Sequence, residues 1–229
     1  MGRQREGNVK LIWSDNFAYI LGVIATDGNL SPDLRHICIT SKDHEMVLNC
    51  KTYLNLQNKI DRKARGTYHD KKYYILQFGD KNFFEFLQSI GITTKKSMTI
   101  STLGIPEKYF PSFFLGCIDG DGCISISSHP ESKHAQCKIR IYSASPNFLE
   151  WLLKNCTKIL KTSGGSIMSF PSVRVSCLSF GKGDSKKIIE SVYSKNTMCL
   201  SRKRKVAMEV LKENTKSSIS DIVFKNDRN

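Results

Sequence analysis

Two aspartates, Asp27 and Asp121, occupy the same place in two similar stretches of the chain. Residues 20–28 read ILGVIATDG and residues 114–122 read FLGCIDGDG, so each apolar stretch has a glycine in its middle and ends in Asp-Gly. Two carboxylates that meet repel each other, and a bound Mg²⁺ removes that cost because hard divalent cations prefer carboxylate, water and phosphate oxygens. The pair therefore predicts a divalent metal site suited to a phosphate ester.

The stretches that carry the aspartates are predicted to be helices. Their apolar residues run almost without interruption, which is the pattern of a helix buried all round. The small residues Gly22, Ala25, Gly116 and Gly120 would let two such helices approach closely, since glycine carries no Cβ. An acid at a helix C-terminus is unfavourable by ~0.3–1 kcal/mol, so two such acids indicate that something positive lies nearby. We expect a pair of helices at a pseudo-twofold axis.

The order of elements repeats between the two halves. Residues 36–54 and 137–156 each read as a short strand, a serine and an amphipathic helix. Residues 73–92 and 173–193 each read as an alternating strand ending in Phe-Gly, followed by a helical segment. Each half then reads helix, two strands, helix, two strands, helix. The remaining strand of each half is expected around residues 59–65 and 166–173.

Capping residues and breaks complete this organisation. Ser41 and Ser143 are expected to cap the helices that follow them, or to precede a capping Asp43 and Ser145. Gly104 and Pro106 mark the break between the halves. The predicted units are an N-terminal repeat over residues 1–102, a C-terminal repeat over residues 103–211 and a polar tail over residues 212–229.

The charge balance favours a polyanionic partner. Thirty-five Lys and Arg residues against 21 Asp and Glu give a formal net charge of +14. No apolar run approaches the ~18 residues that span a bilayer, so we expect nucleic acid rather than a membrane. The polar N-terminus does not resemble a signal peptide, and the eight cysteines include no C-x-x-C pair. We expect an intracellular protein, cytoplasmic or organellar and not secreted, with reduced thiols.

The paired motifs resemble those of the LAGLIDADG homing endonucleases in their single-chain, two-repeat form, over roughly residues 14–211. The second copy matches strongly, and the first departs by having Ala25 where the second has Asp119. The resemblance implies that the last acid of each motif is catalytic and binds metal, so these roles fall on Asp27 and Asp121. Asp119 is then secondary, and the backbone of Thr26 is assigned no role.

The resemblance also implies a mixed α+β fold. Two pseudo-symmetric αββαββα repeats would pack through the paired motif helices, and their antiparallel β-saddles would form a DNA-binding groove. A basic residue near the scissile phosphates is implied at the end of each repeat. GITTKKSMTI (residues 91–100) points to Lys96, with Lys95 beside it, and MCLSRKRK (residues 198–205) points to Lys203, with Arg202 adjacent. Either cluster could instead be a solvated helix start or a phosphate contact without catalytic duty.

The strands offer candidates for DNA contact. In residues 137–142, Ile139 and Ile141 are expected to face the core, while Lys138, Arg140 and Tyr142 face solvent. The resemblance implies that such a solvent face lies along the major groove, where Arg and Lys read guanine or hold phosphates. The candidates are Arg35, Lys59, Lys63, Arg65, Lys71, Lys138, Arg140 and Arg174.

The implied activity is Mg²⁺-dependent hydrolysis of one phosphodiester on each strand of a long, asymmetric double-stranded DNA target, by a monomer. Mn²⁺ is expected to substitute for Mg²⁺, and Ca²⁺ to support binding without cleavage. Two alternatives use the same scaffold, an intron RNA maturase and a DNA-binding regulator. The presence of both acids disfavours a role in binding alone. His129 and His134 could form a metal pair, although a polar hairpin loop is the preferred interpretation.

Overall fold

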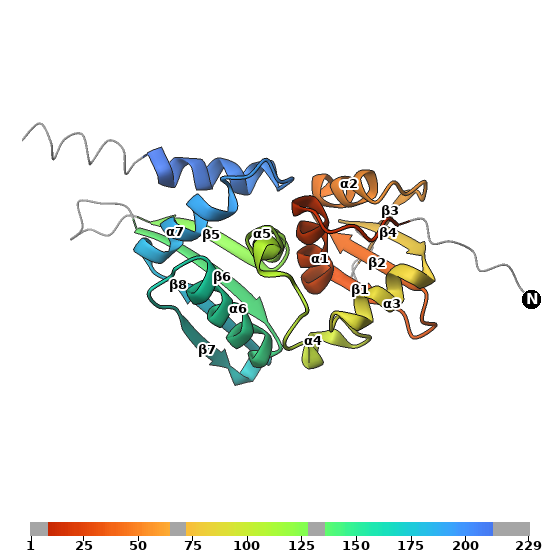
Figure 1. The fold of residues 1–229 in the computed structure, drawn as a ribbon, viewed down its shortest axis with the longest axis horizontal. Helices are drawn as coiled ribbons and strands as arrows, with labels where there is room; N and C mark the ends of the chain where they lie inside the picture. The colour runs from red at the N-terminus through yellow and green to blue at the C-terminus, as the bar shows by residue number, and fades with distance from the viewer. Residues whose placement is uncertain (1–8, 65–71, 128–135, 213–229) are drawn as a thin grey trace, which may run out of the picture.

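The computed structural model describes residues 9–64, 72–127 and 136–212. Within them, two halves follow the same order of helices and strands (Figure 1). The first half consists of α1 (Asp15–Asp27), β1 (Gly28–Leu30), β2 (His36–Ser41), α2 (His44–Tyr53), β3 (Ile60–Lys63), β4 (Tyr73–Gly79) and α3 (Lys81–Ser89), followed by the short α4 (Lys96–Thr99). The second half consists of η1 (Glu107–Tyr109), α5 (Phe110–Asp119), β5 (Gly122–Ser127), β6 (Gln136–Ser143), α6 (Pro146–Ile159), β7 (Ser166–Phe170), η2 (Pro171–Val173), β8 (Val175–Phe180) and α7 (Lys182–Val192), followed by a helix over residues 201–212. The predicted mixed α+β fold with two αββαββα repeats is confirmed.

Each half forms an antiparallel sheet with the same strand order. The described strands are ordered β1-β2-β4-β3 in the first sheet and β5-β6-β8-β7 in the second. Helices α2 and α3 pack on the first sheet, and α6 and α7 on the second. In β6, Ile139 and Ile141 are buried while Lys138 and Tyr142 are exposed, as the alternation predicts. Each sheet therefore has one face on the core and one open face.

Three basic residues expected at strand positions lie just outside the strands. Arg35 precedes β2, Lys59 precedes β3, and Arg174 lies between η2 and β8 with a φ of 51°. The strand expected over residues 166–173 ends at Phe170, because Pro171 has no N–H to donate to the ladder and a 3₁₀ turn follows. Arg174 therefore occupies a left-handed turn, and its expected placement in a strand is wrong.

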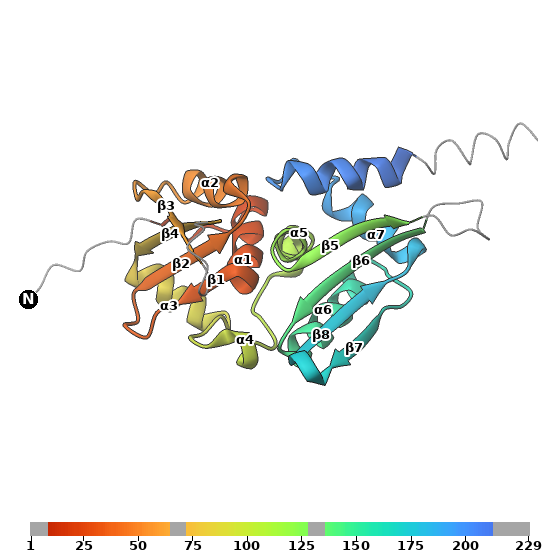
Figure 2. The ribbon, with the colours of Figure 1, turned by 180° about the vertical axis from the view of Figure 1, so that it is seen from behind.

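The centre of the molecule is the contact between α1 and α5, which lie side by side between the two sheets (Figures 1 and 2). A Cβ on Gly22 would lie 2.1 Å from the carbonyl oxygen of Phe113. In the matching position, a Cβ on Gly116 would lie 2.1 Å from the carbonyl oxygen of Tyr19. Only glycine allows the two backbones to approach this closely. The predicted close helix pair is confirmed.

The helix termini show how the sequence repeat becomes a structural repeat. The Ser41 hydroxyl accepts from the Asp43 amide at 3.1 Å, and the Ser143 hydroxyl accepts from the Ser145 amide at 3.1 Å. Asp43 and Ser145 occupy the N-cap positions of α2 and α6, as the second alternative expects, but neither side chain makes a capping hydrogen bond.

Two properties of the whole chain concern its environment. No helix in the described ranges combines the length and apolar character that crossing a membrane requires. All eight cysteines carry free thiols in the structure, and most of them are buried.

Candidate active site

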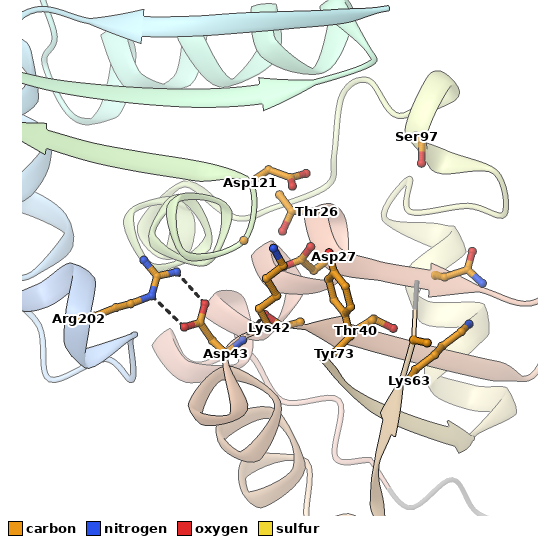
Figure 3. A pocket seen from close by; sticks show the side chains of 14 residues that line it. Thr26, Asp27, Thr40, Lys42, Asp43, Lys63, Tyr73, Ser97, Asp121 and Arg202 are labelled. Carbon is orange, nitrogen blue, oxygen red and sulfur yellow. Dashed lines mark hydrogen bonds and ion pairs between the residues drawn. The ribbon is translucent and has the colours of Figure 1, made fainter. Parts of the chain in front are cut away.

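Asp27 and Asp121 come together at one end of the helix pair. Asp27 is the last residue of α1, whereas Asp121 stands two residues beyond the end of α5, after Gly120, so the expectation that both acids end a helix holds only for Asp27. Both line one open cleft of about 680 Å³ together with Thr26 and Gly120, and Thr26 lies between the two aspartates in Figure 3. Burial, followed by the Asp121 carboxylate, raises the pKa of Asp27 from 3.8 to about 7. The two carboxylates are therefore close enough to repel each other.

The rest of the cleft is polar and carries basic groups. Lys42 and Lys63 from the first repeat and Arg202 from the second line it together with the two aspartates (Figure 3). Arg202 is held by two hydrogen bonds to Asp43, at 2.9 and 2.7 Å, which join the second repeat to the N-cap of α2. The hydrogen bond from Arg202 lowers the pKa of Asp43, and this effect is larger than the opposite effect of burial. The other lining residues are Asn29, Thr40, Ser41, Ala64, Tyr73 and Ser97.

Lys96 lies beneath the cleft rather than in its lining. Its side chain is buried, and Nζ donates to the carbonyl oxygens of Ala25 and Thr26, both at 2.8 Å. Burial lowers the pKa of Lys96 to about 8, against the opposing effect of the two aspartates. The last carbonyls of a helix have no partner within the helix, so this ammonium group caps the C-terminus of α1.

Lys203 does the same for α5. Its buried Nζ donates to the carbonyl oxygens of Ile118 at 2.6 Å, Asp119 at 2.8 Å and Gly122 at 2.8 Å. Burial also lowers the pKa of Lys203. The two lysines singled out by sequence thus occupy matching places, each holding the turn that presents one aspartate. Their predicted catalytic role stays a prediction.

Asp119 has a different environment from the two cleft aspartates. It is buried, and its Oδ2 accepts from the Tyr19 hydroxyl at 2.9 Å and from the Leu200 amide at 2.7 Å. Its Oδ1 has no hydrogen-bond partner among the described residues. Burial raises the pKa of Asp119 to about 6, although the Leu200 amide opposes that shift. Asp119 therefore connects α5 to α1 and to the segment that carries Arg202 and Lys203.

The donor set of the cleft fits a hard divalent cation. Over the described ranges, no group of three or more His, Cys, Asp and Glu side chains is arranged to hold a metal. The candidate ligands are the carboxylates of Asp27 and Asp121, one from each repeat, and their mutual repulsion is what a cation would relieve. The remaining ligands of such a cation would be main-chain, water and phosphate oxygens.

The candidate DNA contacts divide into three groups. Lys63, Lys138 and Arg140 lie on the open faces of the sheets, and Arg140 Nη1 donates to the Ser125 hydroxyl at 3.5 Å. Arg35, Lys59 and Arg174 are exposed at strand ends. Arg65 and Lys71 lie outside the described residues, as do His129, His134 and residues 213–229 of the predicted tail.

Sequence reasoning missed the contribution to the cleft of the turn between β2 and α2. Lys42 and Asp43 follow β2 directly, and Asp43 was expected only as a helix cap. Its ion pair with Arg202 joins residues 159 positions apart, and Ser201 donates to Glu45 in the same region. No local pattern signals such contacts. The conspicuous basic run from Arg202 to Lys205 was the only available hint.

The fold and the site define a two-repeat α+β protein with one carboxylate from each repeat at a shared cleft. Residues 14–91 match the family model of the LAGLIDADG-like domain. The homing endonuclease I-DmoI, solved as mesophilic variants, superposes with a TM-score of 0.56 at 16% identity, covering 84% of this chain and 96% of that chain. The LAGLIDADG homing endonuclease I-GzeII, solved in complex with its DNA target, gives 0.57 at 13% identity, covering 93% and 96%.

Full-length DUF199/WhiA from Thermatoga maritima also superposes, with a TM-score of 0.54 at 15% identity, covering 97% of this chain and 71% of that chain. A comparison with curated proteins gave no match. The chain thus contains a LAGLIDADG-like domain in its first repeat and has the fold of the single-chain LAGLIDADG homing endonucleases.

Proposed function

We propose that this protein is a site-specific DNA endonuclease that makes a metal-dependent double-strand break in a long, asymmetric DNA target. The observation that carries the proposal is the pair of carboxylates, one from each repeat, at a cleft that also contains Lys42, Lys63 and Arg202. Two like charges brought together in a basic cleft suit a cation and a phosphate between them. The fold by itself does not decide the matter, because DUF199/WhiA shares it.

Asp27 and Asp121 would hold Mg²⁺, which supplies charge neutralisation and polarises the scissile phosphate for hydrolysis. I-DmoI has been solved with its target DNA in the presence of Mg, as a variant, and of Mn, and each structure superposes with a TM-score of 0.52. This supports the choice of a divalent cation, with Mn²⁺ able to replace Mg²⁺. Ca²⁺ should support binding without cleavage.

The chain's own residues then have separate tasks. Lys96 and Lys203 fix the turns that present the two carboxylates, by capping α1 and α5. Lys42, Lys63 and Arg202 would contact phosphates beside the reacting groups. Lys138 and Arg140, on the open face of the second sheet, would contact the flanking duplex. Because the two repeats differ in sequence, a single chain would read two different half-sites.

A binding role alone, as an RNA maturase or a DNA-binding regulator, is the alternative. It gives no reason for two carboxylates from different repeats to share one cleft at the cost of mutual repulsion. Cleavage separates the two classes of function, because a binding protein tolerates loss of the carboxylates and an endonuclease does not.

The decisive experiment uses Asp27→Asn and Asp121→Asn, with Glu150→Gln as the matched control. Glu150 is exposed on α6 and does not line the cleft, and its substitution removes one negative charge. A randomised duplex library first identifies the sequence that the wild-type protein binds in Ca²⁺ and cleaves in Mg²⁺. Both aspartate variants should lose double-strand cleavage by ~10²–10³-fold, the range for removing one group that stabilises charge in the transition state, while binding persists in Ca²⁺. Full cleavage by either variant would reject the proposed ligands.

A further inference from the structure

The open faces of the two sheets differ in chemical character. In the second sheet, Tyr142 of β6 lies opposite Cys177 of β8, which lies opposite Met168 of β7. In the next row, Val175 lies opposite Phe170. Directly opposed residues share a face, as do residues two apart on one strand, so these five side chains form one continuous apolar surface, the apolar row, in which Cys177 is only 5% exposed. Met168 is 59% exposed, and Phe170 and Tyr142 are each 40% exposed.

The corresponding row of the first sheet is largely polar. Thr40 of β2 lies opposite Ile75 of β4, which lies opposite Asp61 of β3, and Tyr73 lies opposite Lys63. The strand order is the same in both sheets, so Asp61 corresponds to Met168 and Lys63 to Phe170. The two repeats therefore present different chemistry at equivalent places.

The apolar row is continuous with the candidate active site. The Tyr142 amide donates to the carbonyl oxygen of Asp121 at 3.2 Å. In the first repeat, the counterparts Thr40, Tyr73 and Lys63 line the cleft that contains Asp27 (Figure 3). Lys138 and Arg140 lie on the same open face as the apolar row. A surface that adjoins the carboxylates and carries two cations fits DNA better than an apolar protein partner.

We propose that the apolar row reads the C5-methyl groups of thymines in the major groove of the half-site bound by the second repeat. The proposal rests on the proposed function. Thymine is the only unmodified base that displays a methyl group in the major groove, and apolar side chains recognise it by contact. Met168 and Phe170 bear no group that could bind a phosphate. Contact with a methyl group removes apolar surface from water on both sides.

The test uses the duplex selected from a randomised library in Ca²⁺ buffer, synthesised again with deoxyuridine in place of thymidine in one half-site at a time. Deoxyuridine lacks only the methyl group. In one half-site this replacement should weaken binding about fourfold per contacted methyl, the factor that corresponds to burying one CH₂-sized group. In the other half-site the change should stay below about twofold.

Protein variants assign the effect to the row. Met168→Ala and Phe170→Ala should bind the thymidine and deoxyuridine duplexes nearly equally, because the methyl group has lost its partner. Asp61→Ala, at the corresponding place in the first sheet, should keep the wild-type ratio of the two affinities. The replaced side chains are exposed, so the variants should melt within a few degrees of the wild type.

Several results would overturn the proposal. Equal affinities for the thymidine and deoxyuridine duplexes in both half-sites would do so, as would an unchanged ratio in Met168→Ala. A selected target without thymine in either half-site would also reject it. If the row instead mediates self-association, Phe170→Ala would abolish a dimer without altering methyl sensitivity. Failure of the wild-type protein to select any DNA would count against the proposed function itself, whereas selection without methyl sensitivity counts only against this inference.

Discussion

Asp27 and Asp121 occupy matching sequence positions but unequal environments. Asp27 is half-buried at the end of α1, whereas Asp121 is exposed beyond α5. The two repeats also differ at the preceding residue, which is Thr26 in the first and Gly120 in the second. A Cβ on Gly120 would lie 2.0 Å from the Thr26 hydroxyl, so the second repeat needs glycine there. Because Asp27 is the more buried of the two aspartates, its side chain bears the larger cost of burial. The ionisation of Asp27 can therefore be used to follow the electrostatics of the site.

This environment predicts a pH dependence of stability in the metal-free protein. An unfolded aspartate ionises near pH ~3.9, whereas the pKa of Asp27 in the folded protein is raised to about 7 by burial and by Asp121. The folded state holds a proton between these values that the unfolded state has lost, so this contribution to stability falls as pH rises through that window. In EDTA, Asp27→Asn should melt above the wild type at pH 8 and close to it at pH 4.

Addition of Mg²⁺ or Ca²⁺ at pH 8 should raise the melting temperature of the wild type more than that of Asp27→Asn, since a cation relieves the repulsion. A difference between the two proteins that stays constant from pH 4 to pH 8 would contradict this account of Asp27.

Asp119 is a buried residue that connects α5 to the helix carrying Lys203, and so to the candidate active site. Its Oδ2 holds the Leu200 amide, just before the helix over residues 201–212 that carries Lys203. The first repeat has Ala25 at the matching position, so only the second repeat has this link. Asp119→Ala should therefore disturb one half of the site more than the other.

We expect Asp119→Ala to accumulate nicked duplex, with cleavage of one strand slowed about tenfold, the effect of losing a charge-assisted hydrogen bond of ~1.5 kcal/mol. Tyr19→Phe removes only the other bond to Oδ2 and should leave the two strand rates nearly balanced. Gel separation of nicked and linear plasmid measures both rates. Equal slowing of the two strands by Asp119→Ala would indicate a general loss of structure instead.

At the scale of the elements, the helix pair depends on two glycines. Gly22→Ala would push a methyl group to 2.1 Å from the Phe113 carbonyl oxygen, a backbone atom that cannot swing aside. Overpacking of this kind costs ~1–3 kcal/mol or more, so the variant should melt well below the wild type.

Gly183→Ala is the matched control, because a Cβ there meets nothing within 4 Å. Within α7, that replacement should be neutral or stabilise by ~0.5–1 kcal/mol. Similar melting temperatures for the two variants would rule out the tight contact.

The parts of this architecture that the sequence could predict are those set by a local pattern of residues. Alternation placed Ile139 and Ile141 on the core face, and the duplicated Asp-Gly stretches located the helix pair. Contacts between residues far apart in the chain, which tertiary packing determines, could not be predicted from the sequence. Lys96 caps carbonyls 71 and 70 positions away, and no periodicity encodes which atoms a buried ammonium group meets. Arg174 appeared to continue an alternating strand, but Pro171 interrupts the ladder just before it.

At the scale of the whole molecule, the two repeats are joined by more than the helix pair. The helix over residues 201–212 begins beside α1 and α2 of the first repeat (Figure 2). There Arg202 pairs with Asp43, and Ser201 donates to Glu45. Lys195 also pairs with Asp15 at the start of α1, at 2.7 Å. The cleft is therefore assembled from both repeats, and neither repeat alone supplies both Asp27 and Asp121.

The net charge of +14 gives a prediction for the molecule as a whole. Each phosphate neutralised by a basic side chain contributes about −0.9 to the slope of log K against log salt concentration for duplex DNA. Lys63→Ala and Lys138→Ala each remove an exposed cation from an open sheet face, so each should reduce that slope by about 1.

Lys154→Ala is the matched control, because Lys154 is exposed on α6, which packs against the opposite face of the second sheet. It lowers the net charge equally but should leave the slope unchanged. Titrations of the selected duplex at several salt concentrations measure all three slopes, and an equal change in all three would mean that total charge, rather than the open faces, determines binding.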